Sequence, residues 1–137
     1  MSRWIAPAVF AVLLLGSCAQ SPERIAREHA KAESDLATAL AGRVAGKPVS
    51  CLSNDQTRNA QIIDSRTILY SQTGRTVWRN DIRGSCPSLR PGSILIVEVY
   101  GSQLCRNDRF RVTEPGATIP SAYCLFGSFT PYTRARN

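Results

Sequence analysis

Four widely separated cysteines constrain this chain more than any other feature. A chain this short buries a modest core, and covalent cross-links add what such a core lacks. The four are Cys51, Cys86, Cys105 and Cys124. No two of them form the Cys-x-x-Cys pair that is typical of a zinc site. In an exported chain an even number of cysteines indicates disulfides, so we expect two bonds, each contributing about 2–4 kcal/mol. Three pairings are possible, and the spacing does not choose between them.

The N-terminus indicates that the chain is exported. Arg3 precedes an apolar run over residues 4–15, and small residues follow it. A charged start, an apolar segment and small residues before a cleavage point are typical of a secretory signal peptide. The run is too short to span a bilayer as a helix, which takes about 20 apolar residues.

The end of that run, Leu15-Gly16-Ser17-Cys18, resembles the lipobox of bacterial lipoproteins. The resemblance implies cleavage between Ser17 and Cys18, and lipid, including palmitate, on Cys18. Ala19, the next residue, is similar to an outer-membrane address in Gram-negative lipoproteins. We therefore expect a lipid-anchored protein of the bacterial cell envelope, on the periplasmic face of the outer membrane.

Two other interpretations of the N-terminus stay open. In one, an ordinary peptidase removes the signal peptide and Cys18 is incidental. In the other, the apolar run is a core helix of a cytosolic protein.

The chain after Cys18 divides into a helical part and a β part. Ser21 is a good helix N-cap, Pro22 suits the first helical position, and alanine-rich sequence continues to residue 41, before Gly42. The expected parts, in order, are a signal peptide at 1–17, a lipid-anchored helical spacer at 18–47, a disulfide-linked β domain at 48–130 and a flexible basic tail at 131–137.

Beyond residue 48, β-branched and aromatic residues come in short runs separated by Gly, Pro and Asn, which is typical of strands. We expect strands at 49–52, 60–64, 67–71, 75–80, 93–100, 103–105, 110–113 and 123–126. Thr73-Gly74 and Gly101-Ser102 are typical of tight turns. The most apolar run, Ile94–Val97, is the expected central strand, covered on both faces. The pattern predicts a mainly β fold, a small antiparallel barrel of OB or SH3-like size preceded by one N-terminal helix.

The chain is basic, with a formal net charge of +7. Arg75 and Arg79 share one face of an expected strand, and Arg109 and Arg111 share one face of another. These four arginines predict a basic outer face that contacts an anionic surface. The alternatives are a merely solvated face opposite the core, and arginine usage that follows genomic base composition.

Nucleic-acid binding is not expected. Such sites stack bases on aromatic side chains that lie among the charges. Here Trp78 and Phe110 fall on the opposite strand face from the neighbouring arginines, so they are expected to point inward.

Catalytic groups are sparse in the sequence. The β part contains no histidine, its cysteines are expected in disulfides, and its acidic residues are scattered singly. We therefore expect no enzyme, no metal site and no cofactor. The segment 62–68 resembles the Val-Asp-Gly-Asp-Thr strand and turn of thermonuclease-like OB domains. Arg66 stands where that family has an acidic residue that helps hold calcium, which speaks against a nuclease.

Four stretches together resemble an uncharacterised proteobacterial family of small envelope lipoproteins that contains a domain of unknown function. They are residues 41–52, residues 62–64 with 67–70, residues 101–105 with Asp108, and residues 125–129. The resemblance implies a compact β domain behind a lipobox and supplies no activity. It also implies the pairing Cys51–Cys105 with Cys86–Cys124.

The expected function is a non-enzymatic binding or structural module, held at the membrane by the lipid on Cys18. Its expected partner is an envelope protein or an anionic envelope polymer. The alternative is an inhibitor of a periplasmic or host hydrolase. Such an inhibitor needs an acidic target, because like charges repel. A third interpretation is an enzyme, such as a degenerate thermonuclease-like domain.

Overall fold

The structure is a computed structural model that describes residues 21–71 and 75–135. Ser17, Cys18 and the expected turn at Thr73-Gly74 lie outside the described residues. Helix α1 (Pro22–Leu40) begins as predicted: the Ser21 side chain accepts a hydrogen bond from the backbone N–H of Arg24. The helix ends just before Gly42, whose φ of +67° favours glycine.

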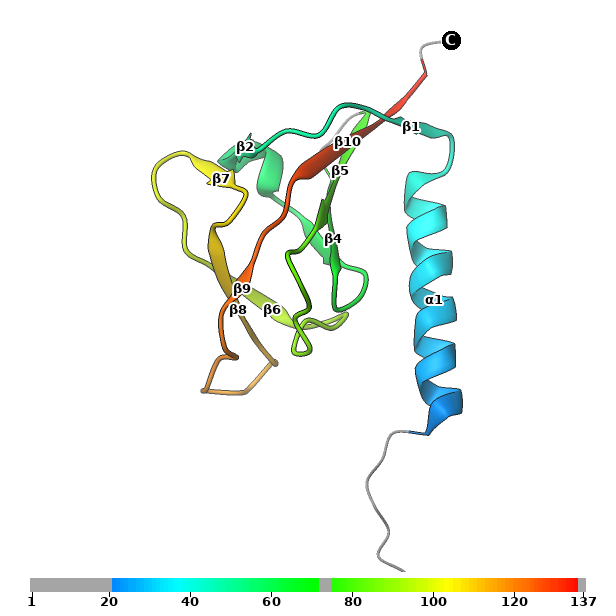
Figure 1. The fold of residues 1–137 in the computed structure, drawn as a ribbon, viewed down its shortest axis with the longest axis vertical. Helices are drawn as coiled ribbons and strands as arrows, with labels where there is room; N and C mark the ends of the chain where they lie inside the picture. Colours follow the sequence, from blue (N-terminus) through cyan, green and yellow to red (C-terminus); the bar gives the residue numbers. More distant parts are fainter. Residues whose placement is uncertain (1–20, 72–74, 136–137) are drawn as a thin grey trace, which may run out of the picture.

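Helix α1 lies beside the β part of the molecule (Figure 1). Its C-terminal half contacts the sheet through a small apolar cluster in which Ala32 of the helix packs with Leu69 and Val77 of two strands. Ile25, nearer the start of the helix, is 41% exposed. The helix is therefore docked over its second half, while its first half stands away from the sheet.

The described residues after α1 contain ten strands and one short 3₁₀ segment, η1 (Asn54–Thr57). The strands are β1 (Arg43–Ala45), β2 (Cys51–Ser53), β3 (Ala60–Ile62), β4 (Thr67–Ser71), β5 (Thr76–Asp81), β6 (Ile94–Val97), β7 (Gln103–Cys105), β8 (Arg109–Thr113), β9 (Cys124–Leu125) and β10 (Phe129–Arg134).

The prediction of a mainly β fold with one N-terminal helix is confirmed. All strand pairs are antiparallel. The described strands form three sheets, ordered β1-β10-β5-β4-β3, β2-β7 and β6-β8-β9, so their ladders do not close into one barrel. Isolated bridges, Val49 with Phe129 and Arg83 with Leu125, link neighbouring sheets.

The expected limits of the β domain, 48 and 130, are too narrow. Strand β1 lies in the expected spacer, and most of β10 lies in the expected flexible tail, yet β10 is paired on both sides, by β1 and β5. Pro131 argues against a central strand, because it lacks an N–H. Here Pro131 lies just past the end of β1, and its carbonyl accepts the N–H of Gly46 at 2.7 Å. The missing donor therefore faces Gly46, beyond the last paired residue of β1, and the pairing of β10 with β5 is unaffected.

The expectation that Ile94–Val97 is a central strand is wrong. Strand β6 is at the edge of its sheet, and β8 is in the centre. Leu95 and Val97 pack against the core, whereas Ile94 and Ile96 are 49% and 40% exposed. Gly101 has the expected positive φ of +88°, but β6 and β7 belong to different sheets, so this turn does not join a hairpin.

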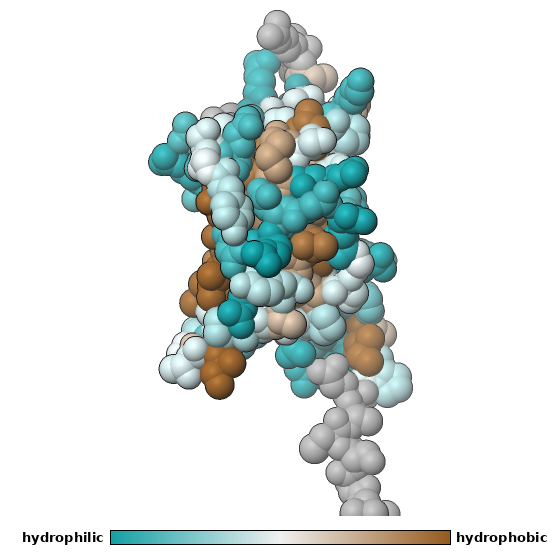
Figure 2. Space-filling view, turned by 60° about the vertical axis from the view of Figure 1, so that its left-hand side comes forward, coloured by the Kyte–Doolittle hydropathy of each residue, from teal (hydrophilic) through white to brown (hydrophobic). Residues whose placement is uncertain are grey.

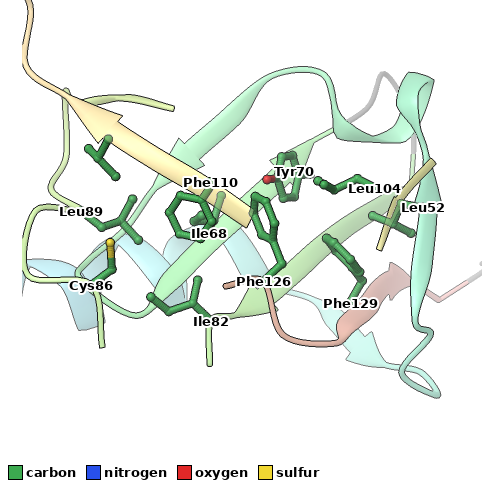
Figure 3. Packing of buried hydrophobic residues seen from close by; sticks show 11 residues of the cluster. Leu52, Ile68, Tyr70, Ile82, Cys86, Leu89, Leu104, Phe110, Phe126 and Phe129 are labelled. Atoms are coloured by element: carbon green, nitrogen blue, oxygen red, sulfur yellow. The ribbon is translucent and has the colours of Figure 1, made fainter. Parts of the chain in front are cut away.

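One apolar core lies between the three sheets (Figure 3). The rings of Phe110 and Phe126 lie 4.5 Å apart, and Phe129 packs beside Phe126 at 6.3 Å. Leu52 and Leu104 bring β2 and β7 to the same cluster. The core thus holds together strands that share no ladder.

Two disulfides cross-link this core, as expected. The pairs are Cys51–Cys105, which joins β2 to β7 at directly opposite positions, and Cys86–Cys124, which ties the loop after β5 to β9. They are the pairs that the family resemblance implies. Cys86 is itself fully buried in the core.

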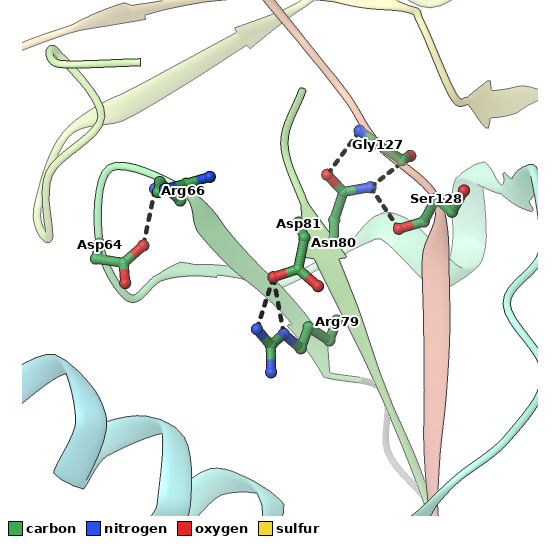
Figure 4. A network of polar contacts seen from close by, with 7 residues as sticks. All are labelled: Asp64, Arg66, Arg79, Asn80, Asp81, Gly127 and Ser128. Carbon is green, nitrogen blue, oxygen red and sulfur yellow. Dashed lines mark hydrogen bonds and ion pairs between the residues drawn. The ribbon is translucent and has the colours of Figure 1, made fainter. Parts of the chain in front are cut away.

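A buried polar network fixes the approach to β10 (Figure 4). Asn80 of β5 is fully buried. Its amide group donates to the carbonyls of Gly127 and Ser128 at 2.9 and 3.3 Å, and its side-chain oxygen accepts the Gly127 N–H at 3.2 Å. A side chain at Gly127 would collide with the backbone oxygen of Asp81, so glycine is required there.

Candidate functional site

The four arginines predicted to form one basic face lie on two different sheets. Arg79 lies on β5 of the five-stranded sheet, and Arg75 directly precedes that strand. Arg109 and Arg111 lie on β8 of the three-stranded sheet. Local strand parity does not reveal this separation, because sheet membership depends on long-range pairing. The inward positions predicted for the aromatic residues agree with the structure: Phe110 is fully buried and Trp78 packs against the core.

Arg79 is poorly suited to bind an external anion. Its side chain is 28% exposed and pairs with Asp81 at 2.7 Å (Figure 4). Burial lowers the pKa of Arg79, but the hydrogen bond and charge of Asp81 outweigh that effect and leave the pKa raised. Its charge is therefore already matched within the protein.

Arg109 and Arg111 lie on the outer face of the sheet β6-β8-β9. The register places Ile96 opposite Arg111. It also places Arg109 opposite Leu125, and extending this pairing by two residues places Arg111 opposite Tyr123. Opposite residues of an antiparallel pair share a face. The outward side chains, which we call the arginine–tyrosine face, are Ile94, Ile96, Glu98, Arg109, Arg111 and Tyr123.

Tyr123 is the centre of this face. The guanidinium carbons of Arg109 and Arg111 lie 4.8 and 5.2 Å from the centroid of its ring, within the range of cation–π attraction. The Tyr123 hydroxyl donates to one oxygen of Glu98 at 2.8 Å, while the other Glu98 oxygen pairs with Arg109 at 3.1 Å. Both cations thus lie close to the ring, and about half of the surface of Tyr123 stays exposed.

Arg109 and Tyr123 both remain protonated at neutral pH. Hydrogen bonding to Tyr100 and the charge of Glu98 raise the pKa of Arg109. The hydrogen bond to Glu98 raises the pKa of Tyr123, because a hydroxyl that donates to a carboxylate resists deprotonation. Both groups therefore keep their usual protonation states in neutral solution.

Arg111 differs from Arg109 in its partners. Its Nε donates to the carbonyl of Ser121 at 2.8 Å, and an Nη atom donates to the carbonyl of Pro120 at 3.3 Å. Within residues 21–71 and 75–135, no carboxylate forms an ion pair with Arg111. Arg111 is half-buried, and neutral carbonyls orient its guanidinium without cancelling its charge, so this cation is fixed in place without an ion-pair partner among the described residues.

Exposed apolar side chains do not form one continuous surface in the view of Figure 2. Several brown groups lie along the left edge of the view, and others are isolated among teal polar side chains. Apolar side chains that are scattered singly are ordinary on a protein surface and do not by themselves mark a binding site.

A groove of about 540 Å³ separates the first half of α1 from the loops near residues 64 and 87. Its lining includes Ile25, Ala32 and Leu89 together with charged side chains, among them His29 and Asp64. The carboxylate of Asp64 accepts the backbone N–H of Arg66 at 2.7 Å, which is the geometry of a turn (Figure 4). That role accounts for the thermonuclease-like segment without any metal ligand.

In residues 21–71 and 75–135, no three His, Cys, Asp or Glu side chains lie close enough together to hold a metal ion. No helix in the same part of the chain has the length and apolar character needed to cross a bilayer.

Neither a protein-family model, nor a curated protein, nor a solved structure matches this chain. The functional conclusion therefore rests on the residues and their geometry.

Sequence reasoning missed Glu98 and Tyr123 as members of the site. Both were assigned to expected strands, but nothing local indicates that they meet. Twenty-five residues separate them in the chain, and only the β6-β8-β9 register brings the Tyr123 hydroxyl to Glu98.

Proposed function

We propose that this chain is an exported, lipid-anchored protein of the bacterial cell envelope, and that its β domain is a non-enzymatic module that binds phosphate-bearing envelope polymers. The oriented cation of Arg111, beside the ring of Tyr123 and without a carboxylate partner in the described chain, carries the proposal. The planar guanidinium matches phosphate oxygens geometrically. The overall charge of +7 attracts the same partners from a distance.

The anchor is proposed from Leu15-Gly16-Ser17-Cys18. The two disulfides support an oxidising compartment, in keeping with export. The full chain and its Cys18→Ser variant would be produced with labelled palmitate and fractionated. The proposal expects label and membrane association in the wild type and loss of the label in the variant, which keeps the apolar run at residues 4–15. An unlabelled wild type that still associates with membranes would refute the anchor.

Binding is tested with two defined probes, phosphatidylglycerol vesicles and purified lipopolysaccharide, which distinguish the two sources of phosphate. The chain that begins at residue 19 is used, so that neither the lipid nor the apolar run at residues 4–15 contributes. Arg111→Gln is expected to weaken co-sedimentation at least about tenfold, which corresponds to one charge-assisted contact of about 1.4 kcal/mol. Arg75→Gln, the same change on the other sheet, is the matched control and is expected to change little. Equal losses in the two variants would show that only net charge matters.

A further inference from the structure

Strand β6 has no neighbour on its outer side within the described chain. The backbone N–H of Glu98 donates to the carbonyl of Arg109 at 3.1 Å, so this directly opposite pair is hydrogen-bonded. Such pairs alternate along an antiparallel ladder, which makes Ile96 with Arg111 the next bonded pair. The peptide groups of Leu95 and Val97 therefore point away from β8, toward the open edge.

The edge has few of the features that usually protect an edge strand. Proteins block such edges with Lys, Pro, bulges, very short strands or a covering segment, and β6 is short at four residues but has no Lys, Pro or bulge. Strand β6 reads Ile-Leu-Ile-Val, and its register with β8 is unbroken. Ile94 and Ile96 are 49% and 40% exposed on its outer face. An open apolar edge of this kind is suited to pair with another strand.

We propose that the chain forms a symmetric dimer in which the β6 strands of two copies pair antiparallel about a two-fold axis at Ile96. In this register Leu95 lies opposite Val97 of the second copy, and the reverse holds across the axis. Each of these pairs exchanges two backbone hydrogen bonds, so every edge-facing peptide group of Leu95 and Val97 gains a partner. The same patch serves both copies, as a two-fold interface requires.

One alternative register is disfavoured by a group already engaged in the monomer. An axis at Leu95 would place Val97 opposite Ser93, whose N–H already donates to the carbonyl of Arg90 at 3.0 Å. An axis at Ile96 uses only free edge groups.

Charge is compatible with the axis at Ile96. This axis places Glu98 opposite Ile94 of the second copy, so like charges do not face each other across the seam. Glu98 keeps its contacts with Arg109 and Tyr123. A second copy is therefore the occupant whose hydrogen-bonding pattern and side chains complement this edge.

The dimer would join two arginine–tyrosine faces into one continuous surface, with Arg111 of each copy flanking the paired Ile96 side chains. Formation of the dimer does not depend on the lipid anchor or on phosphate binding, so its failure would leave the proposed function untouched.

Cysteine cross-linking tests the register. The side chains at Ile96 would be a directly opposite, non-hydrogen-bonded pair. This chain already bridges such a pair at Cys51–Cys105, as shown by the bonds that flank it, Asn54 N–H to Ser102 and Arg106 N–H to Ser50. After mild copper-phenanthroline oxidation of the full chain, Ile96→Cys is expected to give mostly covalent dimer.

Two matched variants control for chance collisions. Ile94→Cys lies on the same strand face but faces Glu98 of the second copy, and Ile119→Cys lies on an exposed loop at 84% exposure. Both are expected to stay monomeric. Peptide mapping would verify that the native disulfides are intact. Cross-linking of all three variants alike would overturn the proposal, as would a folded, monomeric Ile96→Cys chain.

A second pair of variants tests association without cross-linking. Ile96→Lys introduces facing positive charges at the axis and is expected to reduce the particle mass, measured by light scattering, from dimer to monomer. Ile119→Lys makes the same chemical change on the loop and is expected to leave the dimer intact. A wild-type chain that is monomeric at concentrations of tens of micromolar, or that pairs only with a different protein, would contradict the proposal.

Discussion

The buried amide of Asn80 allows a quantitative test of how the β10 segment is held. Its three hydrogen bonds, to Gly127 N–H and to the carbonyls of Gly127 and Ser128, are the side-chain bonds that link β5 to the approach to β10. At about 1 kcal/mol net for each bond, Asn80→Ala is expected to destabilise the protein by about 3 kcal/mol. Asn54→Ala, an exposed substitution in η1, is the control and is expected to change stability by less than about 0.5 kcal/mol.

Asn80→Asp sharpens the same test, because the side chains are nearly isosteric. The introduced carboxyl can still accept the Gly127 N–H, but at neutral pH it places negative charge against two carbonyl oxygens. Burial raises its pKa in the folded state above the ordinary value of about 3.9, so the folded variant binds the proton more tightly than the unfolded variant. The stability that depends on this proton is therefore fully present only below that ordinary value and is lost as pH rises through the folded pKa.

Urea unfolding with both disulfides intact, followed by the fluorescence of Trp78, measures both variants between pH 4 and pH 7. The expected result is a pH-dependent gap between Asn80→Asp and the wild type, together with a constant gap for Asn80→Ala. The reasoning would be refuted by an Asn80→Ala cost below about 1 kcal/mol, or by an Asn80→Asp chain as stable as the wild type at pH 7.

Three further variants test the core and its cross-links. Gly127→Ala forces a Cβ into the Asp81 carbonyl and is expected to destabilise by more than about 3 kcal/mol in the same urea assay; a loss under 1 kcal/mol would contradict it. Tyr70→Phe removes a buried hydroxyl that has no hydrogen-bond partner among the described residues, and is expected to stabilise by about 1 kcal/mol. Burial also raises the pKa of Tyr70, so the free energy of unfolding should fall as pH rises above about 10, less steeply in Tyr70→Phe; parallel slopes would count against this. Removing the cross-link with the double change Cys51→Ala and Cys105→Ala should cost about 2–4 kcal/mol, read as a lower urea midpoint, and an unchanged midpoint would argue against a structural role for the bond.

Local signals were sufficient for the helix and for most strands. Ser21 and Pro22 predicted the start of α1, and the punctuated runs at 67–71 and 103–105 coincide with β4 and β7. These signals depend on caps, turns and alternation, which are properties of neighbouring residues.

The predictions that were wrong concern features that depend on pairing between strands far apart in the sequence. Residues 131–137 were expected to form a flexible tail. The position where Pro131 lacks an N–H faces Gly46, just past the end of β1, so β10 continues through the proline to Arg134. The apolar run of β6 looked central, yet its outer residues, such as Ile96, are left exposed at the sheet edge. The composition of a strand shows how apolar it is, but it does not determine which strands pair with it.

The candidate site was predictable in part for the same reason. Strand parity placed Arg109 and Arg111 together on an outer face, as the structure has them. It also grouped them with Arg75 and Arg79, which lie on another sheet. Tyr123, whose ring lies close to the two site arginines, immediately precedes β9 in the chain, and no local sequence pattern links it to β8.

The most direct test of the proposed binding function is amide hydrogen exchange of the chain that begins at residue 19, with and without saturating lipopolysaccharide. The proposal predicts slower exchange confined to the peptides that carry Arg109, Arg111 and Tyr123, and loss of that protection in Arg111→Gln. Protection centred on α1 or on β5 near Arg75, or no protection at a concentration where the polymer binds, would contradict it.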